Sequence, residues 1–471
     1  MLIGREKERK LLEDIMRDEM SHFVAIYGRR RIGKTFLIRE TFDYRFTFQH
    51  AGLSQGSLRD QLYAFESSIR DAGVETGKKA KNWLEAFEEL KEVIRVSSEK
   101  KKVIFIDELS WMDTPRSDLL VALENFWNGW ASARKDVVLI VSASATSWML
   151  SNVIHNKGGL YNRITERLHI EEFSLGECEI FARENGFSFN RTQLLQYYMV
   201  FGGVPYYWTF LKKGFSIAQN IDMALFDPEA PLKNEFKYLY ASIFRHPNDY
   251  IKIIEALSKK KAGMTREEII EKAKLVNSGD LTKKMEELES CGFVRKYNAF
   301  GMKKKNSVFQ LVDFYTLFYY EFLIKEPTDP HFWSNQINTP TVNAWQGLSF
   351  ERICMKHAER IKQKLGISGV YTEMNSWYCK PDREKGVKGS QIDLLIVRKD
   401  QVINLCEMKY SATDYTVDDQ TEQNVRNKVN DFIKETGTKY AIFPTLITTL
   451  GMVRNSHSDV FQSVVTLNDL F

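Results

Sequence analysis

The sequence is poor in the residues that build disulfide frameworks and zinc sites. Its five cysteines stand singly, without a C-x-x-C pair, and its eight histidines form no H-x-x-x-H pattern. We therefore expect no structural zinc. We also expect a reducing compartment, because a disulfide-stapled secreted chain would carry paired cysteines.

Long apolar runs and an excess of one charge are also missing. No window approaches the roughly 18 uninterrupted apolar residues of a membrane span, and residues 1–7 lack the apolar stretch of a signal peptide. Lysine and arginine number 66 against 62 aspartates and glutamates, so any basic surface must be local. The sequence predicts a cytoplasmic protein with no membrane partner.

A glycine-rich turn is the most specific motif in the chain. Residues 28–35 spell G-x-x-x-x-G-K-T, after the apolar run 23–27 and before a helix-like segment at 36–40. Backbone N–H groups of such a turn surround phosphates, and the helix N-terminus adds positive charge. The alternative is a chance match in a solvated turn. The motif predicts an ATP site formed by Gly28, Arg29, Arg30, Arg31, Ile32, Gly33, Lys34 and Thr35.

Two carboxylates at the end of an apolar strand supply the groups that an ATP site needs for Mg²⁺ and for the attacking water. Residues 103–106 are continuously apolar, as in a strand buried on both faces, and Asp107 and Glu108 follow. Lys34 would reach the β- and γ-phosphates, and Thr35 and Asp107 would hold Mg²⁺. Glu108 would orient or deprotonate the attacking water. A strand that merely ends in an acidic turn is the alternative.

Polar residues after the next apolar strand suggest two accessory groups. Ser144 follows residues 137–141 and is the candidate sensor of the γ-phosphate, although such hydroxyls also cap helices. Arg163 and Arg167 lie beyond the core, where an oligomeric ATPase presents an arginine to its neighbour. Arg163 is the candidate finger and would require a homo-oligomer; the alternative is a surface arginine.

Changes of pattern divide the 471 residues into four parts. Strand and helix alternate to about residue 173, and helices broken at 202–205 follow. Proline pairs at 227–231 and 326–330 mark linkers. We expect an α/β chain with these parts: a P-loop ATPase core of parallel strands (1–173), a helical lid (174–235), a winged helix (236–326) and a C-terminal α/β domain (331–471).

The winged helix is predicted from three helices and a basic hairpin. Helices are expected at 250–257, after a capping box at 265–268, and after 278–280; strands at 293–297 and 307–312 flank a lysine triplet at 303–305. In DNA-binding versions the third helix enters the major groove and the wing touches phosphate. Lys283 and Lys284 suit that role, whereas nearby glutamates do not. The alternative is a winged helix used for packing.

A C-terminal hairpin carries the third constellation. If residues 391–397 fold back on 402–409, Asp393 lies beside Cys406 and Glu407, and Glu407 and Lys409 share one face. The two carboxylates could hold Mg²⁺ or Mn²⁺, and Lys409 could position an attacking water. Glu351, on an upstream helix, could add a further ligand.

Two alternatives to this metal site remain open. The hairpin could simply be an edge that carries solvated charges. Asp382, after Pro381, competes with Asp393 for the place of the first carboxylate, but it lies in a loop rich in lysine and glycine.

Taken together, the motifs resemble a family of prokaryotic P-loop ATPases of the AAA/STAND superfamily, described mostly from archaea. The resemblance implies ATP hydrolysis, Gly4 and Arg5 near the adenine, a winged helix, and a restriction-endonuclease-like domain of the PD-(D/E)xK class. One departure is Ser142-Ala143, where the family is expected to carry Cys-Gly. The motifs behind the resemblance are Ile3–Glu6, Tyr27–Thr35, Ile106–Glu108, Ser144–Met149, Gly202–Tyr206, and Asp393 with Glu407–Lys409.

The sequence therefore predicts an ATPase whose nucleotide state controls a DNA-binding, Mg²⁺-dependent nuclease-like domain. The resemblance suggests a role in defence or in mobile elements. A nucleotide-dependent binding switch of the STAND type, without nuclease activity, is the alternative.

Overall fold

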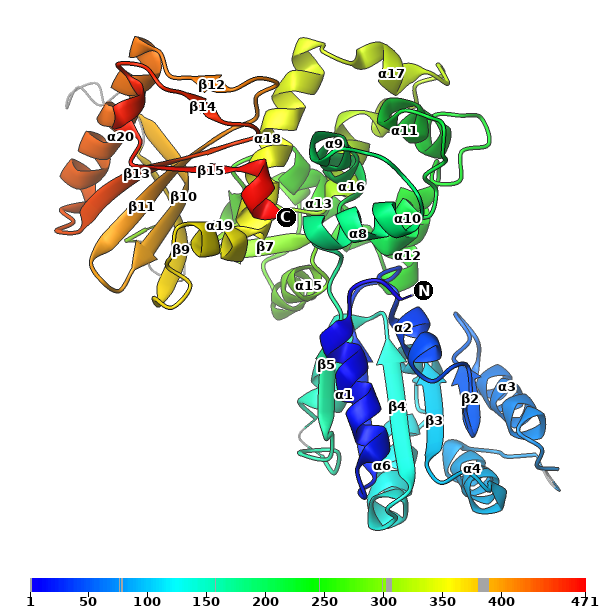
Figure 1. Ribbon diagram of the computed structural model, residues 1–471. Helices are drawn as coiled ribbons and strands as arrows, with labels where there is room; N and C mark the ends of the chain where they lie inside the picture. The colour runs from blue at the N-terminus through cyan, green and yellow to red at the C-terminus, as the bar shows by residue number, and fades with distance from the viewer. Residues whose placement is uncertain are drawn as a thin grey trace.

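The computed structural model describes residues 2–75, 77, 79–156, 158–244, 246–298, 300–301, 307–379 and 389–471. Figure 1 shows an N-terminal lobe, coloured blue to cyan, that is joined to a larger lobe holding the rest of the chain. The lysine triplet 303–305 and the Pro381-Asp382 pair, both named above, lie outside the described residues.

The N-terminal lobe is a five-stranded parallel sheet in the order β2-β3-β4-β1-β5. Side chains alternate along each strand, so Phe23 and Ala25 pack into one core cluster while Val24 and Ile26 pack into another on the opposite face. This confirms the predicted parallel core. The strands are β1 (His22–Tyr27), β2 (Phe48–Ala51), β3 (Lys102–Asp107), β4 (Val137–Ala143) and β5 (Glu166–His169).

Helices cover both faces of this sheet. Buried side chains of α3, α4 and α6 belong to the cluster of Phe23, and those of α1 and α2 belong to the cluster of Val24. The helices of this lobe are α1 (Glu6–Arg17), α2 (Lys34–Thr41), α3 (Leu58–Asp71), α4 (Trp83–Val96), α5 (Leu109–Met112), α6 (Leu119–Gly129), η1 (Ala131–Ala133), α7 (Thr146–Met149) and η2 (Leu150–Ile154).

A group of helices follows, and then a compact unit that we call the middle module (residues 248–311). In this module β8 pairs antiparallel with both β6 and β7, and the predicted capping box at Thr265 and Glu268 starts α14. The elements are α8 (Leu175–Glu184), α9 (Arg191–Phe201), α10 (Pro205–Trp208), α11 (Ile217–Leu225), α12 (Glu235–Ile243), α13 (Asn248–Ser258), β6 (Met264–Thr265), α14 (Arg266–Ala273), α15 (Gly279–Ser290), β7 (Val294–Tyr297) and β8 (Val308–Leu311).

One hydrophobic core runs from the helical region through the middle module to the C-terminal part of the chain. It includes Trp208, Phe293, Phe318, Trp333 and Ile447. The boundaries placed at 227–231 and 326–330 stay predictions. The connecting helices are α16 (Phe314–Glu321), η4 (Leu323–Lys325), α17 (Phe332–Gln336), α18 (Pro340–Lys356) and α19 (Ala358–Lys364).

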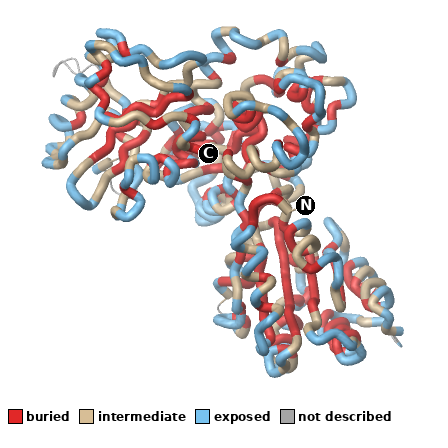
Figure 2. The backbone as a smooth tube through the Cα atoms, viewed as in Figure 1, coloured by how far each residue is buried: buried red, intermediate tan, exposed pale blue. Residues whose placement is uncertain are grey.

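The C-terminal domain is a mixed sheet in the order β15-β13-β11-β10-β9. Strands β9, β10 and β11 are antiparallel, whereas β13 and β15 run parallel to β11, and Figure 2 shows the middle strands largely buried. The elements are β9 (Thr372–Cys379), β10 (Ser390–Arg398), β11 (Val402–Lys409), β12 (Tyr415–Thr416), α20 (Asp419–Thr436), β13 (Ala441–Thr448), β14 (Met452–Val453), η5 (Ser458–Val460), β15 (Ser463–Thr466) and η6 (Leu467–Leu470).

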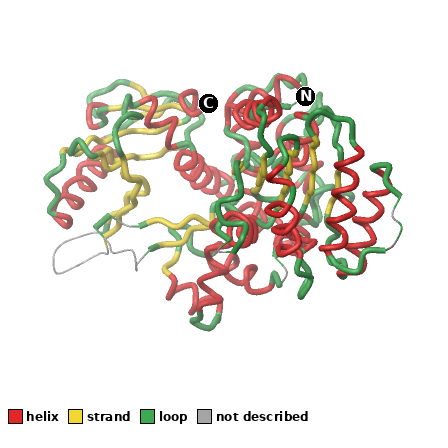
Figure 3. Tube along the Cα trace, turned by 90° about the horizontal axis from the view of Figure 1, so that it is seen from below, coloured by secondary structure: helices red, strands yellow, loops and turns green. Residues whose placement is uncertain are grey.

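The middle module touches both of its neighbours. After β7, the backbone N–H of Phe300 donates to the carbonyl of Ser376 on β9 at 2.8 Å, and its ring lies 5.1 Å from that of Phe432. Strand β7 contacts β9, and in Figure 3 strands of the module (yellow) lie beside those of the C-terminal sheet. On the other side, α15 contacts α7 of the ATPase lobe. There the backbone N–H of Thr146 donates a hydrogen bond to the sulfur of Cys291. The module is thus held between the two sheets.

Within the part of the chain that the structure describes, we find no helix with both the length and the apolar character needed to cross a membrane.

We expect Gly203→Ala to destabilise the junction between the two lobes. A methyl group at Gly203 would lie 1.8 Å from the carbonyl oxygen of Phe173. This oxygen belongs to the backbone and cannot turn aside as a side chain could. Thermal unfolding should therefore begin several degrees lower. Gly347→Ala in α18 is the matched control, because open space surrounds that position and alanine gains up to about 1 kcal/mol in a helix. Equal unfolding temperatures for both variants would contradict this account.

Candidate functional site

The glycine-rich turn links β1 to α2 at the carboxyl edge of the parallel sheet. Gly28 has φ 144°, and a methyl group there would lie 2.2 Å from the carbonyl oxygen of Ile170. Gly33 has φ 88° and precedes the first turn of α2. Both positions therefore require glycine, and the turn leaves the N-terminus of α2 pointing at the space where phosphates would bind.

Lys34 is buried at the base of this turn. Its ammonium group donates to the carbonyls of Gly28 at 2.9 Å and Arg29 at 3.1 Å and to the hydroxyl of Ser144 at 3.0 Å. Burial lowers the pKa of Lys34. A bound triphosphate would offer this cation better partners than two carbonyls, because hydrogen bonds to anions are the stronger ones.

An oxygen-rich corner lies between α2, β3 and β4. The hydroxyl of Thr35 donates to Asp107 Oδ2 at 2.7 Å, and the hydroxyl of Ser142 donates to Oδ1 of the same carboxylate. Hydroxyl and carboxylate oxygens at one point are the ligands that Mg²⁺ prefers. The donor set therefore fits the predicted ion, with Thr35 and Asp107 as its holders.

Glu108 and Ser144 face each other across this corner. The Glu108 carboxylate accepts from the backbone N–H of Ser144 at 3.0 Å and from its hydroxyl. Glu108 has φ 49°, a left-handed conformation that turns the residue after β3. The candidate water-activating carboxylate is thus held by the candidate sensor, which also accepts from Lys34.

A cavity of about 1040 Å³ opens above the turn, large enough for a nucleotide. Its polar end holds Lys34, Thr35, Glu108 and Ser144. Arg5 also lines it, where the resemblance places the adenine, and packs 5.3 Å from the ring of Phe173. The apolar end is formed by Leu2, Ile3, Phe173, Phe181, Phe187, Trp208 and Leu211.

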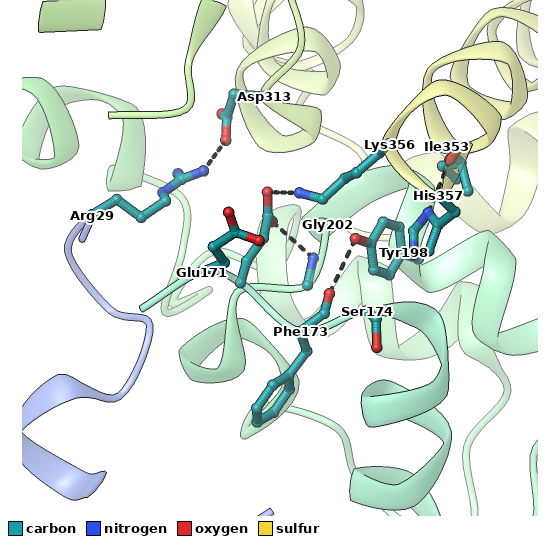
Figure 4. Close-up of polar contacts among 12 residues, drawn as sticks. Arg29, Glu171, Phe173, Ser174, Tyr198, Gly202, Asp313, Ile353, Lys356 and His357 are labelled. Carbon is teal, nitrogen blue, oxygen red and sulfur yellow. Dashed lines mark hydrogen bonds and ion pairs between the residues drawn. The ribbon is translucent and has the colours of Figure 1, made fainter. Parts of the chain in front are cut away.

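Two arginines of the glycine-rich turn pair with carboxylates far along the chain, whereas Arg30 and Arg31 also line the ATP cavity. Arg29 Nη1 pairs with Asp313 Oδ2 at 2.6 Å, and both side chains are buried (Figure 4). Burial alone would lower the pKa of Arg29, but Asp313, with smaller contributions from Glu172 and Tyr207, outweighs it and raises the pKa. Arg31 pairs with Glu235 of α12, and its guanidinium lies 4.3 Å over the ring of Tyr206. The turn is thereby anchored to helices far along the chain.

A second polar chain joins the end of β5 to α18. The carboxylate of Glu172 pairs with Lys356 and accepts from the backbone N–H of Gly203 at 3.0 Å. Next to it, His357 accepts from the Leu175 N–H at Nε2 and bonds the Ile353 carbonyl at Nδ1, so the proton sits on Nδ1 (Figure 4). Burial lowers the pKa of His357 to about 4, which keeps it neutral.

The two candidate finger arginines lie on the surface. Arg163 and Arg167 are both exposed; Arg163 precedes β5 and Arg167 lies in it. Neither approaches the ATP cavity of its own chain. This placement leaves open a role toward a neighbouring subunit, which stays a prediction.

The C-terminal sheet brings the predicted acidic residues together. Leu394 pairs with Cys406, so Asp393 falls next to Glu407 at the end of the β10–β11 ladder, as expected. Glu351 on α18 faces the same region: burial, and after it the carboxylate of Asp393, raises its pKa to about 7. Side chains from one helix and two strands thus act on one another in this region.

Lysines neutralise this acidic cluster. Glu407 pairs with Lys409 at 2.9 Å and with Lys428 of α20 at 2.7 Å. Burial would raise the pKa of Glu407, but the two ammonium groups outweigh it and lower the pKa. Asp393 accepts from Gln391 Nε2 at 2.6 Å. Among the described residues no three metal-binding side chains are grouped around one point, so two carboxylates, with Glu351 nearby, are what this centre offers an ion.

Comparison with known proteins agrees with the geometry of the N-terminal lobe. Residues 2–210 match a family described as an ATPase domain predominantly from Archaea. The N-terminal lobe is thus a P-loop ATPase domain. The identification implies ATP as its ligand.

Similarity extends over most of the chain at a low level. The uncharacterized protein MJECL04 of Methanocaldococcus jannaschii is 23% identical over 399 residues, which cover 84% of each protein. Two solved structures have 15% identity: a Walker-type ATPase of Pyrococcus abyssi (67% of this chain and 95% of that one, TM-score 0.47) and the ORC2 protein of Aeropyrum pernix (76% and 96%, TM-score 0.43). Likeness at this level carries no argument about activity.

Several groups around both centres were not found by sequence reasoning. The aromatic residues of the ATPase cavity come from loops and short helices without a motif, and Lys428 lies in a polar helix. The anchoring of Arg29 and Arg31 did leave a signal: three consecutive arginines are more than the phosphate-binding turn needs.

We expect Asp313→Asn to destabilise the ATPase domain's junction with α16. Asparagine can still cap α16 as Asp313 does through the Thr316 N–H at 2.8 Å, but it leaves the buried charge of Arg29 without a counter-ion. Removing one member of a buried pair costs roughly 3–5 kcal/mol. The midpoint of thermal unfolding should fall accordingly.

Glu13→Gln is the control, because its pair with Arg9 is solvent-exposed and such pairs contribute little. If Asp313→Asn and Glu13→Gln unfolded alike, the buried pair would not be the anchor described here.

Proposed function

We propose that this chain is an ATPase whose nucleotide state controls a metal-dependent DNA nuclease in its C-terminal domain. In the ATPase domain, Lys34 binds the β- and γ-phosphates, and Thr35 and Asp107 hold Mg²⁺. Glu108 orients the attacking water, and Ser144 senses the γ-phosphate. The hydrogen bonds that already join these side chains support the assignment.

The observation that carries the nuclease proposal is that the charges of Asp393, Glu407 and Lys409, from β10 and β11, act on the carboxylate of Glu351 on α18. Asp393 and Glu407 offer the hard oxygens that Mg²⁺ or Mn²⁺ prefers, and a bound ion supplies a Lewis acid that activates water and neutralises phosphodiester charge. Lys409 positions that water, and Glu351 completes the acidic wall. Burial is the main cause of the raised pKa of Glu351 and the charge of Asp393 the second, and a cation here would offset both.

Control by the nucleotide follows from the way the glycine-rich turn is anchored. Lys34 leaves the carbonyls of Gly28 and Arg29 to reach a triphosphate, and Arg29 is fixed to Asp313 at the start of α16. Lys356, bonded to Glu172 near the ATPase domain, lies about one turn after Glu351 on α18. A shift of the turn therefore reaches the helix that carries the nuclease carboxylate.

The middle module has the element order of a winged helix, and the two predicted DNA-binding lysines of α15 are paired with carboxylates. Lys284 pairs with Asp249 and Asp280, and Lys283 lies 4.0 Å from Glu287. The end of its third helix, α15, contacts the ATPase domain. Contact of DNA with this helix would require these pairs to open, so in this arrangement the module serves packing.

A nucleotide-dependent binding switch without nuclease activity is the second candidate. It is favoured by one observation: both carboxylate oxygens of Glu407 are engaged by lysines. In such a switch the exposed Arg163 could meet a neighbour's nucleotide. Light scattering with and without ATP would show nucleotide-dependent oligomers in that case.

Lys34→Ala should abolish ATP binding and lower ATP hydrolysis about 10²-fold or more, because the site loses its phosphate-binding cation. The measurement is phosphate release at saturating ATP and Mg²⁺, with Lys10→Ala as a control that removes an exposed lysine of the same domain. Normal hydrolysis by Lys34→Ala would refute the assignment of the site.

Asp393→Ala and Lys409→Ala should each remove DNA cleavage while ATP hydrolysis continues. Plasmid and single-stranded DNA are incubated with Mg²⁺ or Mn²⁺, with and without ATP. Asp400→Asn is the matched control, because it removes an exposed carboxylate from the turn of the same hairpin.

Cleavage that survives in both active-centre variants would point to another site or to contamination. No cleavage by the unaltered chain under any condition, with ATP hydrolysis present, would favour the binding switch. A dependence of cleavage on ATP, lost in Lys34→Ala, would show that the two activities are coupled.

A further inference from the structure

Arg295 of the middle module lies at the C-terminal acidic centre. It is the second residue of β7, and its charge interacts with the carboxylate of Asp393. Arg295, Arg352 and Asp393 line one cavity of about 890 Å³, which lies between β7, β9 and α18. An arginine contributed from outside the C-terminal domain thus reaches the candidate nuclease centre.

A chain of hydrogen bonds holds Arg295 in this position. Its Nε donates to Gln310 Oε1 at 2.9 Å, and Gln310 Nε2 donates to the carbonyl of Lys261 at 2.7 Å. The same carbonyl accepts from Arg352 Nη2 at 3.2 Å, and Arg352 Nε donates to the carbonyl of Leu311 at 3.2 Å. Because Arg352 follows Glu351 on α18, the spacing between Arg295 and the acidic centre is fixed.

The guanidinium of Arg295 is short of partners. Among the described residues it makes no ion pair with a carboxylate, and one Nε bond to Gln310 leaves the donors at both terminal nitrogens for another acceptor. Burial lowers the pKa of Arg295 to about 10, so the group stays charged at neutral pH. A desolvated cation with free donors is best satisfied by an anion with several oxygens, such as a phosphate.

We propose that Arg295 binds a phosphate of a single-stranded nucleic acid and presents that strand to Asp393. The inference rests on the nuclease proposed above, and it adds the middle module as a contributor to the centre. We choose a single strand because its bases, unlike the paired and stacked bases of a duplex, are free to stack on a side chain. Tyr371, which is 67% exposed and lines the cavity, offers a face on which a base can stack.

The test measures binding without cleavage. A fluorescein-labelled oligothymidylate is titrated with the full chain in EDTA, and fluorescence anisotropy gives the dissociation constant at several salt concentrations. Arg295→Gln should weaken binding about tenfold or more, as expected for one hydrogen-bonded charge. In a plot of log affinity against log salt concentration, the slope should become smaller by about one, because one fewer counterion is released on binding.

Two further variants separate this role from a general loss of charge or fold. Arg295→Lys keeps the charge but loses the planar fork, so its loss of affinity should be smaller. Lys283→Gln removes an equal charge from the exposed face of α15 and should change the affinity less than about twofold. Thermal unfolding of Arg295→Gln should not occur earlier than in the unaltered chain, because a desolvated charge has been removed.

Unaltered affinity in Arg295→Gln would overturn the proposal, as would a larger loss in Lys283→Gln, which would place the strand on α15. Tighter binding of a duplex of matched length that does not depend on Arg295 would overturn it too. If the strand binds through Arg295 but Mg²⁺ brings no cleavage, the phosphate site stands and the nuclease proposal fails. The two ideas are therefore separable.

Discussion

The buried pair between Arg29 and Asp313 is the contact on which the arrangement of the two lobes depends. A guanidinium enclosed by protein needs its counter-ion close by, so the glycine-rich turn and the start of α16 cannot separate without exposing or stranding a charge. Phe293 lies 5.0 Å from the same guanidinium and adds a cation–π contact. The phosphate-binding element of the ATPase domain is therefore also a structural element of the lobe that it could regulate.

The middle module turns this local anchor into a connection across the molecule. Its third helix ends against the ATPase domain at Thr146 and Cys291, while its hairpin reaches the C-terminal sheet through Phe300. The module was predicted to place a helix and a wing on DNA, and that prediction stands beside the contacts that it makes within the chain. Winged helices are amphipathic and compact, which suits them to packing as much as to DNA.

Features that depend on residues close together in the sequence could be predicted, and contacts between residues far apart in the sequence mostly could not. The glycine-rich turn, the strand ending in Asp107 and the capping box at Thr265 are local patterns, in which neighbouring residues determine the backbone, and each was placed correctly. The hairpin of β10 and β11 was also placed correctly, because two apolar strands joined by a short turn can pair in few registers. The pairing of Lys428 with Glu407 was missed because no pattern joins a helix to a distant strand.

The sequence by itself determined the identity of the ATPase motif, the parallel core and the residues that could hold a nucleotide, since these follow from short-range conformational rules. Only the tertiary structure decided which charges meet. It placed Glu351 beside Asp393, directed Arg29 away from the phosphates, and brought Arg295 of one unit to the acidic centre of another. Such contacts depend on how whole elements pack, and a side chain's chemistry alone does not specify its partner.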